Sequence, residues 1–346
     1  MPLRVCVLGD RFVLPELIPD LIRQALGDQA EVSIGQLEWP DGETISGKPG
    51  DAIREYSGRA DDVIRLARGA DALIVHMAPI TREVINALPE LKFVAVCRGG
   101  PVNVDAQAAQ ERGIHLARAP GRNANAVAEF TIGALIAGSR SLVTAATEVR
   151  NGVWSRGHYR YADASIELAE MTVGLIGYSH VGRKVGHLLK AFSANVLFAD
   201  PYQEPDDTDS ALGIEKVDLE TLCARSDVVS VHARLTDATR KMCDAAFFAR
   251  LKDQCVFINT ARGELVDEAA LLAKLESGKV RMAILDTFDP EPPASDSALV
   301  RHPNVIATPH LAGASRTSAH IVARMVVEEL EAWHREMASP GQARRA

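Results

Sequence analysis

The sequence predicts an α/β protein built from parallel β-sheets. Short apolar runs alternate with amphipathic stretches along nearly the whole chain, which is typical of strands joined by helices. Within the runs, apolar residues follow one another without polar alternation, as expected for parallel strands that helices cover on both faces. The length of 346 residues corresponds to about two domains of ordinary size. We therefore expect two doubly wound parallel-sheet domains.

Nine apolar runs are the predicted strands, at residues 5–8, 72–75, 93–96, 173–176, 196–199, 228–232, 256–259, 283–285 and 305–308. Between them lie helical patterns, in which apolar residues such as Val181, Val185 and Leu188 recur at intervals of three or four. A long helical stretch is predicted at about residues 124–149, and a helix is predicted at about residues 315–337. Strands and helices therefore alternate to the end of the sequence.

Composition excludes several classes of protein. Hydrophobic residues make up 47% of the chain and charged residues 24%, which excludes a disordered chain or a fibrous repeat. The net charge of −8 and the lack of a basic stripe predict no nucleic-acid partner. The five cysteines form no C-x-x-C pair, so we expect buried thiols in a reducing compartment, and no metal site. The first apolar run is too short for a signal peptide or a membrane span, which predicts a cytoplasmic protein without a membrane partner.

Two proline- and glycine-containing segments have the character of joints between domains. Residues 119–123 precede the first long helix, and residues 308–313 precede the last one. The chain is therefore expected to cross between two domains twice, an arrangement that suits a hinge.

A dinucleotide-binding pattern follows the predicted strand at residues 173–176. Gly177 and Gly182 flank a tight turn before a helix, and Asp200 ends the next strand, 23 positions after Gly177. This layout places a pyrophosphate at a helix N-terminus and a carboxylate on the adenosine ribose. Ser179 stands where the pattern usually has its middle glycine, and its Cβ atom is expected to hold the phosphates slightly further away unless its hydroxyl supplies a compensating hydrogen bond. No arginine or lysine lies at 201–205 to offset the charge of Asp200, so NAD is favoured over NADP.

Several short motifs, in this order, resemble the D-isomer-specific 2-hydroxyacid dehydrogenases, which include phosphoglycerate dehydrogenases and glyoxylate/hydroxypyruvate reductases. The likeness covers most of residues 93–313, and its motifs are residues 103–105, 177–182 with Asp200, 227–229, 259–267, 285–292 and 308–313. The resemblance implies a catalytic set of Arg262, Glu291 and His310. Histidine suits an acid–base role because it titrates near working pH, and a carboxylate on its far nitrogen fixes its tautomer. Arginine can hold the substrate carboxylate and polarise the 2-oxo group.

The resemblance also implies a set of residues that bind NAD. The backbone N–H groups of His180 and Val181 would hold the pyrophosphate, and Asp286 would bind the carboxamide. Arg234 stands where the family usually has proline, and both adenine stacking and simple solvation remain open for it. The complete expected set is Gly177, Ser179, His180, Val181, Gly182, Asp200, Pro201, His232, Ala233, Arg234, Thr260, Ala261, Arg262, Asp286, His310, Ala312 and Gly313.

The expected substrate site includes Arg262 and His310 together with residues nearer the N-terminus. Gly99 and Gly100 belong to a loop that is similar to the family's carboxylate-binding glycine loop but about two residues shorter. Arg98 lies where phosphoglycerate dehydrogenases place a cation, so it indicates a second anionic or polyhydroxylated end on the substrate, or else a structural arginine. His76 follows a strand that faces the same cleft, and it either contacts substrate or caps the strand.

The implied architecture is a Rossmann-type NAD domain, residues 122–309, inserted in a flavodoxin-like substrate domain, residues 1–121 and 310–346. The implied activity is hydride transfer between NAD and C2 of a D-2-hydroxy acid or 2-oxo acid, of the phosphoglycerate, glycerate or sugar-acid type. Family members usually form homodimers through the first long helical stretch, which predicts the same here.

Two other functions remain open from the sequence. The first is an NAD-sensing binding protein on the same scaffold, because such proteins can retain the catalytic residues. The second is a dehydrogenase for another small anion, as in the phosphite dehydrogenases. The sequence names neither the 2-hydroxy acid nor the physiological direction.

Overall fold

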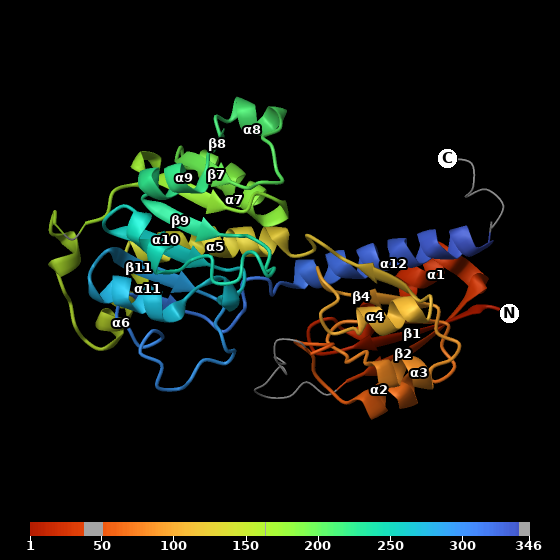
Figure 1. The fold of residues 1–346 in the computed structure, drawn as a ribbon. Coiled ribbons are helices and arrows are strands. Elements are labelled where there is room, and N and C mark those ends of the chain that lie inside the picture. The colour runs from red at the N-terminus through yellow and green to blue at the C-terminus, as the bar shows by residue number, and fades with distance from the viewer. Residues whose placement is uncertain (38–50, 163, 339–346) are drawn as a thin grey trace. The chain divides into compact units, whose positions relative to one another are not determined.

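The computed structural model describes residues 1–37, 51–162 and 164–338, and the chain divides into two compact units (Figure 1). One unit contains Met1–Asn123 and Ala314–Ala346, and the other contains Ala124–Gly313. We call them the split unit and the continuous unit. Each is an α/β structure around its own parallel sheet, which confirms the predicted fold class.

The split unit has a five-stranded parallel sheet in the order β2-β1-β3-β4-β5. Its strands are β1 (Leu3–Gly9), β2 (Ala30–Gln36), β3 (Ala72–Val75), β4 (Phe93–Val96) and β5 (His115–Arg118). Its helices are α1 (Pro19–Leu26), α2 (Ala60–Leu66), α3 (Arg82–Ala87), α4 (Ala106–Glu111) and α12 (Arg316–Ala338), with short 3-10 turns at Pro15–Leu17 and Gly27–Gln29. The strand order reverses between β1 and β3, and ligands of doubly wound sheets bind at such reversals.

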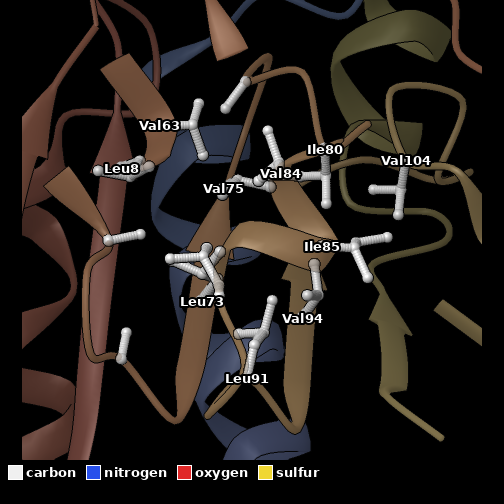
Figure 2. Close-up of a cluster of buried hydrophobic side chains, with 14 of the residues drawn as sticks. Leu8, Val63, Leu73, Val75, Ile80, Val84, Ile85, Leu91, Val94 and Val104 are labelled. Atoms are coloured by element: carbon white, nitrogen blue, oxygen red, sulfur yellow. The ribbon is translucent and has the colours of Figure 1, made fainter. Parts of the chain in front are cut away.

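Both faces of this sheet are covered by helices, because alternate strand residues point to opposite sides. Cys6 and Leu8 of β1 belong to the buried cluster under α2, α3 and α4, part of which Figure 2 shows. Val5 and Val7 of the same strand pack with α1 and α12 on the other face. The unbroken apolar runs of the sequence therefore correspond to strands buried on both faces.

The continuous unit has a seven-stranded parallel sheet in the order β12-β11-β10-β9-β6-β7-β8. Its strands are β6 (Thr172–Ile176), β7 (Asn195–Ala199), β8 (Glu215–Lys216), β9 (Val228–Val231), β10 (Cys255–Asn259), β11 (Val280–Leu285) and β12 (Val305–Ala307). Here the order reverses between β6 and β9.

Seven α-helices belong to the continuous unit. They are α5 (Ala124–Ser139), α6 (Leu142–Arg150), α7 (His180–Ala191), α8 (Asp207–Ala211), α9 (Leu219–Arg225), α10 (Ala245–Arg250) and α11 (Glu268–Glu276). Short 3-10 turns lie at Gly157–Tyr159, Leu168–Glu170 and Gly263–Leu265. Residues of α5 and α7 pack on one face of the sheet, and residues of α9, α10 and α11 pack on the other.

All nine predicted strands are present, with ends that differ by at most a few residues. The helical stretch predicted at about 124–149 is present as two helices, α5 and α6, bent by 63°. The break lies at Ser141, whose φ of +54° is left-handed and cannot continue a helix. The predicted final helix is confirmed as α12.

No single helix of the described chain is long and apolar enough to cross a membrane, and only the bent pair α5 and α6 meets the length and composition of a span. Among the same described residues, no group of three or more histidine, cysteine or acidic side chains is placed to hold a metal ion.

Candidate active site

The glycine turn after β6 packs directly against the chain that leaves β9. Gly177 has a φ of +88°, and a Cβ atom there would lie 2.7 Å from the backbone nitrogen of Ala233. A Cβ atom at Gly182 would lie 2.1 Å from the carbonyl oxygen of Gly177. Both positions therefore require glycine, since the neighbouring atoms are backbone that cannot rotate away. The turn and residues His232 and Ala233 meet at the β6/β9 reversal, where doubly wound sheets bind dinucleotides.

Ser179 occupies the N-cap position of α7 without backbone strain, because its φ is −90°. The side chain is exposed and makes no capping hydrogen bond to the helix. His180 and Val181 form the first turn of α7. The serine therefore does not cap the start of α7, and the backbone N–H groups there can bind an anion.

Asp200 follows β7 at the same edge of the sheet and is half-buried. Its Oδ2 atom accepts a hydrogen bond from the backbone of Tyr178 at 2.7 Å, and its Oδ1 atom accepts one from the backbone of Tyr202 at 2.8 Å. These bonds fix the carboxylate beside the glycine turn. Pro201 follows it and is exposed.

His232 lies on the other side of the turn. Its Nε2 atom is 3.0 Å from the Oγ atom of Ser230, and burial lowers the pKa of His232 to about 4. The ring is therefore neutral at neutral pH. Arg234 is exposed, and its carbonyl oxygen accepts a hydrogen bond from the hydroxyl of Thr239 at 2.7 Å. Nothing in these contacts favours adenine stacking over solvation for Arg234.

The residues at this edge fit NAD on their own geometry. The two glycines allow close approach of the backbone, the helix start is uncapped by Ser179, and Asp200 stands at the end of the neighbouring strand. A pyrophosphate would be held by the first turn of α7, and the carboxylate of Asp200 would accept hydrogen bonds from a ribose.

Arg262 lies in a turn after β10 that Asn259 holds in place. The Nδ2 atom of Asn259 donates to the carbonyl oxygen of Arg262 at 2.8 Å, and its Oδ1 atom accepts from the backbone of Ala261 at 3.0 Å. The guanidinium of Arg262 donates to the carbonyl oxygen of Ala261 at 2.7 Å. Thr260, in the same turn, has its hydroxyl 3.3 Å from that of Thr131 on α5. The buried side-chain amide of Asn259 therefore bridges two backbone groups of this turn.

The turn of Arg262 contacts the loop that carries Glu291. A Cβ atom at Gly263 would lie 2.0 Å from the carbonyl carbon of Phe288, so only glycine permits this backbone contact. The backbone of Phe288 in turn donates to the Oε1 atom of Glu291 at 3.0 Å. The other carboxylate oxygen of Glu291 lies 2.8 Å from the Nδ1 atom of His310. A short series of contacts therefore brings all three predicted catalytic residues to one edge of the sheet.

His310 has an unusual backbone that the surrounding bonds maintain. Its φ is +51°, which is left-handed and costly for a residue with a side chain. Its N–H group donates to the carbonyl oxygens of Asp286 and Thr308 at 2.9 and 3.0 Å. The side chain is partly exposed, and Nδ1 faces Glu291. With Nδ1–H donated to the carboxylate, Nε2 is the ring atom available for proton transfer.

Asp286 has a role that the sequence did not indicate. Its buried carboxylate accepts hydrogen bonds from the hydroxyl of Thr308 at 2.7 Å and from the backbones of Leu311 and Ala312 at 2.9 and 2.8 Å. Asp286 therefore holds the loop of His310, including Ala312, whatever contact it makes with a cofactor. Gly313, the last residue of the continuous unit, ends this loop.

Two predicted substrate residues lie at the carboxyl edge of the split unit's sheet. His76, directly after β3, is buried, and its Nδ1 atom lies 2.6 Å from the Oδ2 atom of Asp10, directly after β1. Arg98, after β4, donates to the backbone carbonyl of Glu55 at 2.6 Å and forms an ion pair with its carboxylate. Arg98 is therefore engaged by an acidic partner that the sequence did not indicate.

Gly99 and Gly100 belong to the same loop, and a Cβ atom at Gly100 would meet nothing within 4 Å. No steric reason for glycine exists at Gly100 within the described structure. Asn103, three residues later, is buried and donates to the carbonyl oxygens of His76 and Ala78 at 3.1 and 2.8 Å. It ties the loop after β4 to the loop after β3.

Sequence reasoning missed four residues that shape these sites: Asp10, Glu55, Asn259 and Gly263. Asn259 and Gly263 lie inside the motif at residues 259–267, but the sequence does not indicate which contacts they make. Asp10 and Glu55 are separated from their partners by 66 and 43 positions, and no local pattern indicates such pairs.

Comparison with known proteins agrees with this geometry. Residues 132–312 match the family model described as the D-isomer specific 2-hydroxyacid dehydrogenase, NAD binding domain. YoaD of Bacillus subtilis (strain 168), which carries the name of a 2-hydroxyacid dehydrogenase, is 40% identical over 265 residues, covering 74% of this chain and 75% of that protein. The D-3-phosphoglycerate dehydrogenase of Methanocaldococcus jannaschii is 36% identical over 271 residues; the match covers 78% of this chain but only 50% of that longer relative.

A solved structure shows the same fold over almost the whole chain. The TT0316 protein from Thermus thermophilus superposes with a TM-score of 0.76 and 28% identity, covering 94% of this chain and 95% of its own. The predicted class of enzyme and the predicted cofactor are therefore confirmed. This chain belongs to the D-isomer-specific 2-hydroxyacid dehydrogenases, a family of NAD-dependent oxidoreductases that act on the CH–OH group of 2-hydroxy acids.

Proposed function

We propose that this chain reduces a small 2-oxo acid to the D-2-hydroxy acid, with Arg262, Glu291 and His310 as its catalytic residues. The observation that carries the proposal is the Glu291–His310 pair, 2.8 Å apart, together with the contact of the Glu291 loop with the turn of Arg262 through Phe288 and Gly263. NAD, when bound in its reduced form, supplies the hydride that C2 accepts. The protein must supply the proton, a positive charge that binds the substrate carboxylate, and groups that orient the substrate.

Each of the three residues has a defined task. His310 donates the proton from Nε2 to the substrate oxygen, and it takes the proton back in the oxidative direction. Glu291 accepts the Nδ1–H bond, which fixes the tautomer and stabilises the positive ring. Arg262 offers a planar fork of donors that holds the carboxylate and polarises the 2-oxo group.

We infer the cofactor contacts from the same edge of the sheet. The glycine turn after β6 and the first helical turn of α7 hold the pyrophosphate. Residues after β9 and β10 line the ribose and nicotinamide side. The proposed set is Gly177, Ser179, His180, Val181, Gly182, Asp200, Pro201, His232, Ala233, Arg234, Thr260, Ala261, Asp286, Ala312 and Gly313, with Arg262 and His310. We assign substrate contacts to His76, Arg98, Gly99 and Gly100, and we keep 122–309 as the cofactor domain within a substrate domain of 1–121 and 310–346.

The decisive experiment is NADH oxidation by the purified protein with glyoxylate, hydroxypyruvate, 3-phosphohydroxypyruvate and sugar-derived 2-oxo acids. We expect turnover that is lost in His310→Ala, with NADPH much less effective because Asp200 repels a 2′-phosphate. Binding of NADH with no turnover of any member of the panel would contradict the proposed reaction.

We propose further that the chain forms a homodimer through α6 and the segment that follows it. Eight large apolar side chains are exposed between residues 142 and 166: Leu142, Val143, Val149, Val153, Trp154, Tyr159, Tyr161 and Ile166. Trp154 is 81% exposed and Tyr161 99% exposed, and an apolar area of this kind marks an interaction site. We propose that a second copy of this chain covers these side chains, as in the two-fold dimers that the family usually forms.

Light scattering after size exclusion tests this proposal. We expect a mass of twice the 37.3 kDa chain, and a monomer for Trp154→Asp combined with Tyr161→Asp. Tyr202→Asp is the control, because Tyr202 is equally exposed but lies after β7, outside this segment. A dimer that survives the double substitution would place the interface elsewhere.

We propose the cytoplasm as the location. All five cysteines are buried free thiols, which suits a reducing compartment. Cell fractionation with an antibody to the chain tests the proposal, and recovery in an extracytoplasmic fraction would contradict it.

A further inference from the structure

The split unit contains a charged cluster at the carboxyl edge of its sheet, where the strand order reverses. Asp10 follows β1, His76 follows β3 and Arg98 follows β4, so three neighbouring strands supply one residue each. Asn103 ties the last two loops together through its two bonds to the backbone after β3. This edge is where a doubly wound sheet places its ligand.

The charge of Arg98 is compensated inside this cluster. Its guanidinium donates to both the backbone carbonyl and the carboxylate of Glu55, and its side chain is only 13% exposed. A partly buried ion pair of this kind is screened little by water, so the carboxylate cancels most of the field that a bound anion would experience. The surface pair Arg82–Glu111 differs, because both of its side chains are about half exposed.

Glu55 is held in position by its backbone. The residue before it, Arg54, donates to the carbonyl oxygen of Val102 at 2.7 Å, and Ser57 donates to that of Met77 at 2.9 Å. Between these two bonds Glu55 has a φ of +51°, a left-handed conformation that costs energy in a residue with a side chain. The chain thus accepts backbone strain while it holds this carboxylate against Arg98.

His76 adds a second feature that favours an uncharged group at the far end of the substrate. Both Asp10 oxygens are occupied: Oδ1 accepts from the backbones of Phe12 and Val13 at 2.9 Å each, and Oδ2 faces Nδ1 of His76. These hydrogen bonds lower the pKa of Asp10, and burial lowers the pKa of His76 despite that carboxylate. The neutral ring therefore carries its proton on Nδ1 and a lone pair on Nε2. Within the described part of the chain, Nε2 makes no hydrogen bond, and a lone pair there accepts a hydroxyl proton but repels a phosphate oxygen.

Arg122 is a further cation in the described part of this edge, and it lies over the ring of Phe12 at 5.8 Å. Of the two described carboxylates in the cluster, Asp10 is engaged by His76 and by backbone N–H groups, and Glu55 is engaged by Arg98.

We propose that Glu55 makes this enzyme selective for 2-oxo acids whose far end is a neutral hydroxyl group, and that it discriminates against phosphorylated ones by neutralising Arg98. The inference rests on the proposed 2-oxo acid reductase activity and on the assignment of this edge to the substrate. It identifies the substrate class as short hydroxylated 2-oxo acids.

The test compares hydroxypyruvate with 3-phosphohydroxypyruvate, which differ only in the phosphate. We expect the wild-type protein to favour hydroxypyruvate by at least tenfold in kcat/KM. Glu55→Gln removes the carboxylate charge that the structure places against Arg98, and the ratio is expected to move at least tenfold towards the phosphorylated substrate. Glu111→Gln makes the same change of net charge at the exposed pair, and we expect it to move the ratio by less than twofold.

A double substitution shows whether the effect passes through Arg98. In Arg98→Gln combined with Glu55→Gln, the gain on 3-phosphohydroxypyruvate is expected to disappear. Glu55→Asp, which retains the charge, is expected to retain the wild-type preference and provides a second reading if Glu55→Gln folds poorly. Thermal unfolding of every variant monitors folding.

Three outcomes would overturn the proposal: a wild-type preference for the phosphorylated substrate, equal effects of Glu55→Gln and Glu111→Gln, or a gain that persists without Arg98. Calorimetric titration of the NAD-loaded protein with glycerate and 3-phosphoglycerate separates this inference from the proposed reaction. If no 2-oxo acid is reduced, the proposed reaction fails. The selectivity itself fails if 3-phosphoglycerate binds as tightly as glycerate.

Discussion

A Cβ atom at Gly263 would lie 2.0 Å from the carbonyl carbon and the carbonyl oxygen of Phe288. The turn that carries Arg262 and the loop that carries Glu291 therefore touch backbone to backbone, and no side chain at residue 263 can enter between them.

Gly263→Ala is accordingly expected to separate the two segments. We expect a loss of about 2 to 4 kcal/mol in the free energy of unfolding, because backbone must move, and a loss of at least a hundredfold in kcat/KM. Urea denaturation and NADH oxidation measure the two effects. Gly133→Ala is the control: it lies in α5 with nothing within 4 Å of the added carbon, so it should leave stability unchanged or raise it. Equal behaviour of the two variants would contradict our account of Gly263.

The second prediction concerns the coupling of His310 and Glu291. His310→Ala is expected to lower kcat by about 10² to 10⁴, the usual contribution of a general acid. Glu291→Gln is expected to lower kcat by about ten- to a hundredfold while KM changes little, because the amide has no negative charge to stabilise the protonated ring. It also has one acceptor oxygen where Glu291 uses two, one towards Phe288 and one towards His310.

The double variant distinguishes a positioning role from an independent one. If Glu291 acts through His310, then adding Glu291→Gln to His310→Ala should cost almost nothing further. Steady-state kinetics of the four proteins provide the cycle. Additive losses would show that Glu291 contributes by another route.

The third prediction concerns Ser179. The side chain is exposed and makes no cap bond, so we expect its Cβ atom to hold a bound pyrophosphate further from the backbone. Ser179→Gly is therefore expected to lower the Kd for NADH by about two- to tenfold, which corresponds to about 0.4 to 1.4 kcal/mol. Fluorescence titration with NADH measures it, and Ser179→Ala should lie close to the wild type. Weaker binding in both variants would identify the hydroxyl as a phosphate ligand and reject the steric explanation.

The fourth prediction concerns stability in acid. His232 has a pKa of about 4 in the folded protein because of burial, whereas a histidine in the unfolded chain titrates near 6.5. Below about pH 6.5 the unfolded state takes up a proton that the folded state does not, so stability falls with pH until about pH 4.

We expect His232 to account for about 2 kcal/mol of the stability lost between pH 7.5 and pH 4.5. The pKa values of His76 and Asp10 are also lowered, so these groups also make the protein less stable as the pH falls. The wild type alone therefore does not isolate the effect of His232. The measurement is therefore the difference between wild type and His232→Asn in urea unfolding at both pH values. An identical pH dependence of the two proteins would contradict this assignment.

The strands that the sequence failed to predict share one property. β2, β5 and β8 all lie at sheet edges, where one side has no neighbouring strand. Burial along β2 alternates irregularly, and β8 has only two residues, so neither forms an unbroken apolar run. Unbroken apolar runs identify strands that are covered on both faces, and these three edge strands lack such a run, whereas β12, which is also an edge strand, has one and was predicted.

The candidate site shows the same limit at the level of single residues. Arg262, Glu291 and His310 lie in sequence motifs, so the resemblance to the family identifies them as candidates. The left-handed backbone of His310 and the loop-holding bonds of Asp286 depend on contacts between distant segments. Glu55 gives no local indication of its pairing with Arg98, and that pairing changes the charge that a substrate meets.

The division of the chain separates the proposed chemistry from the proposed selectivity. Arg262, Glu291 and His310 all belong to the continuous unit, whereas Glu55 and Arg98 belong to the split unit. Substitutions at Glu55 or Arg98 are therefore expected to change which acid is accepted while the residues proposed to transfer the proton keep their arrangement.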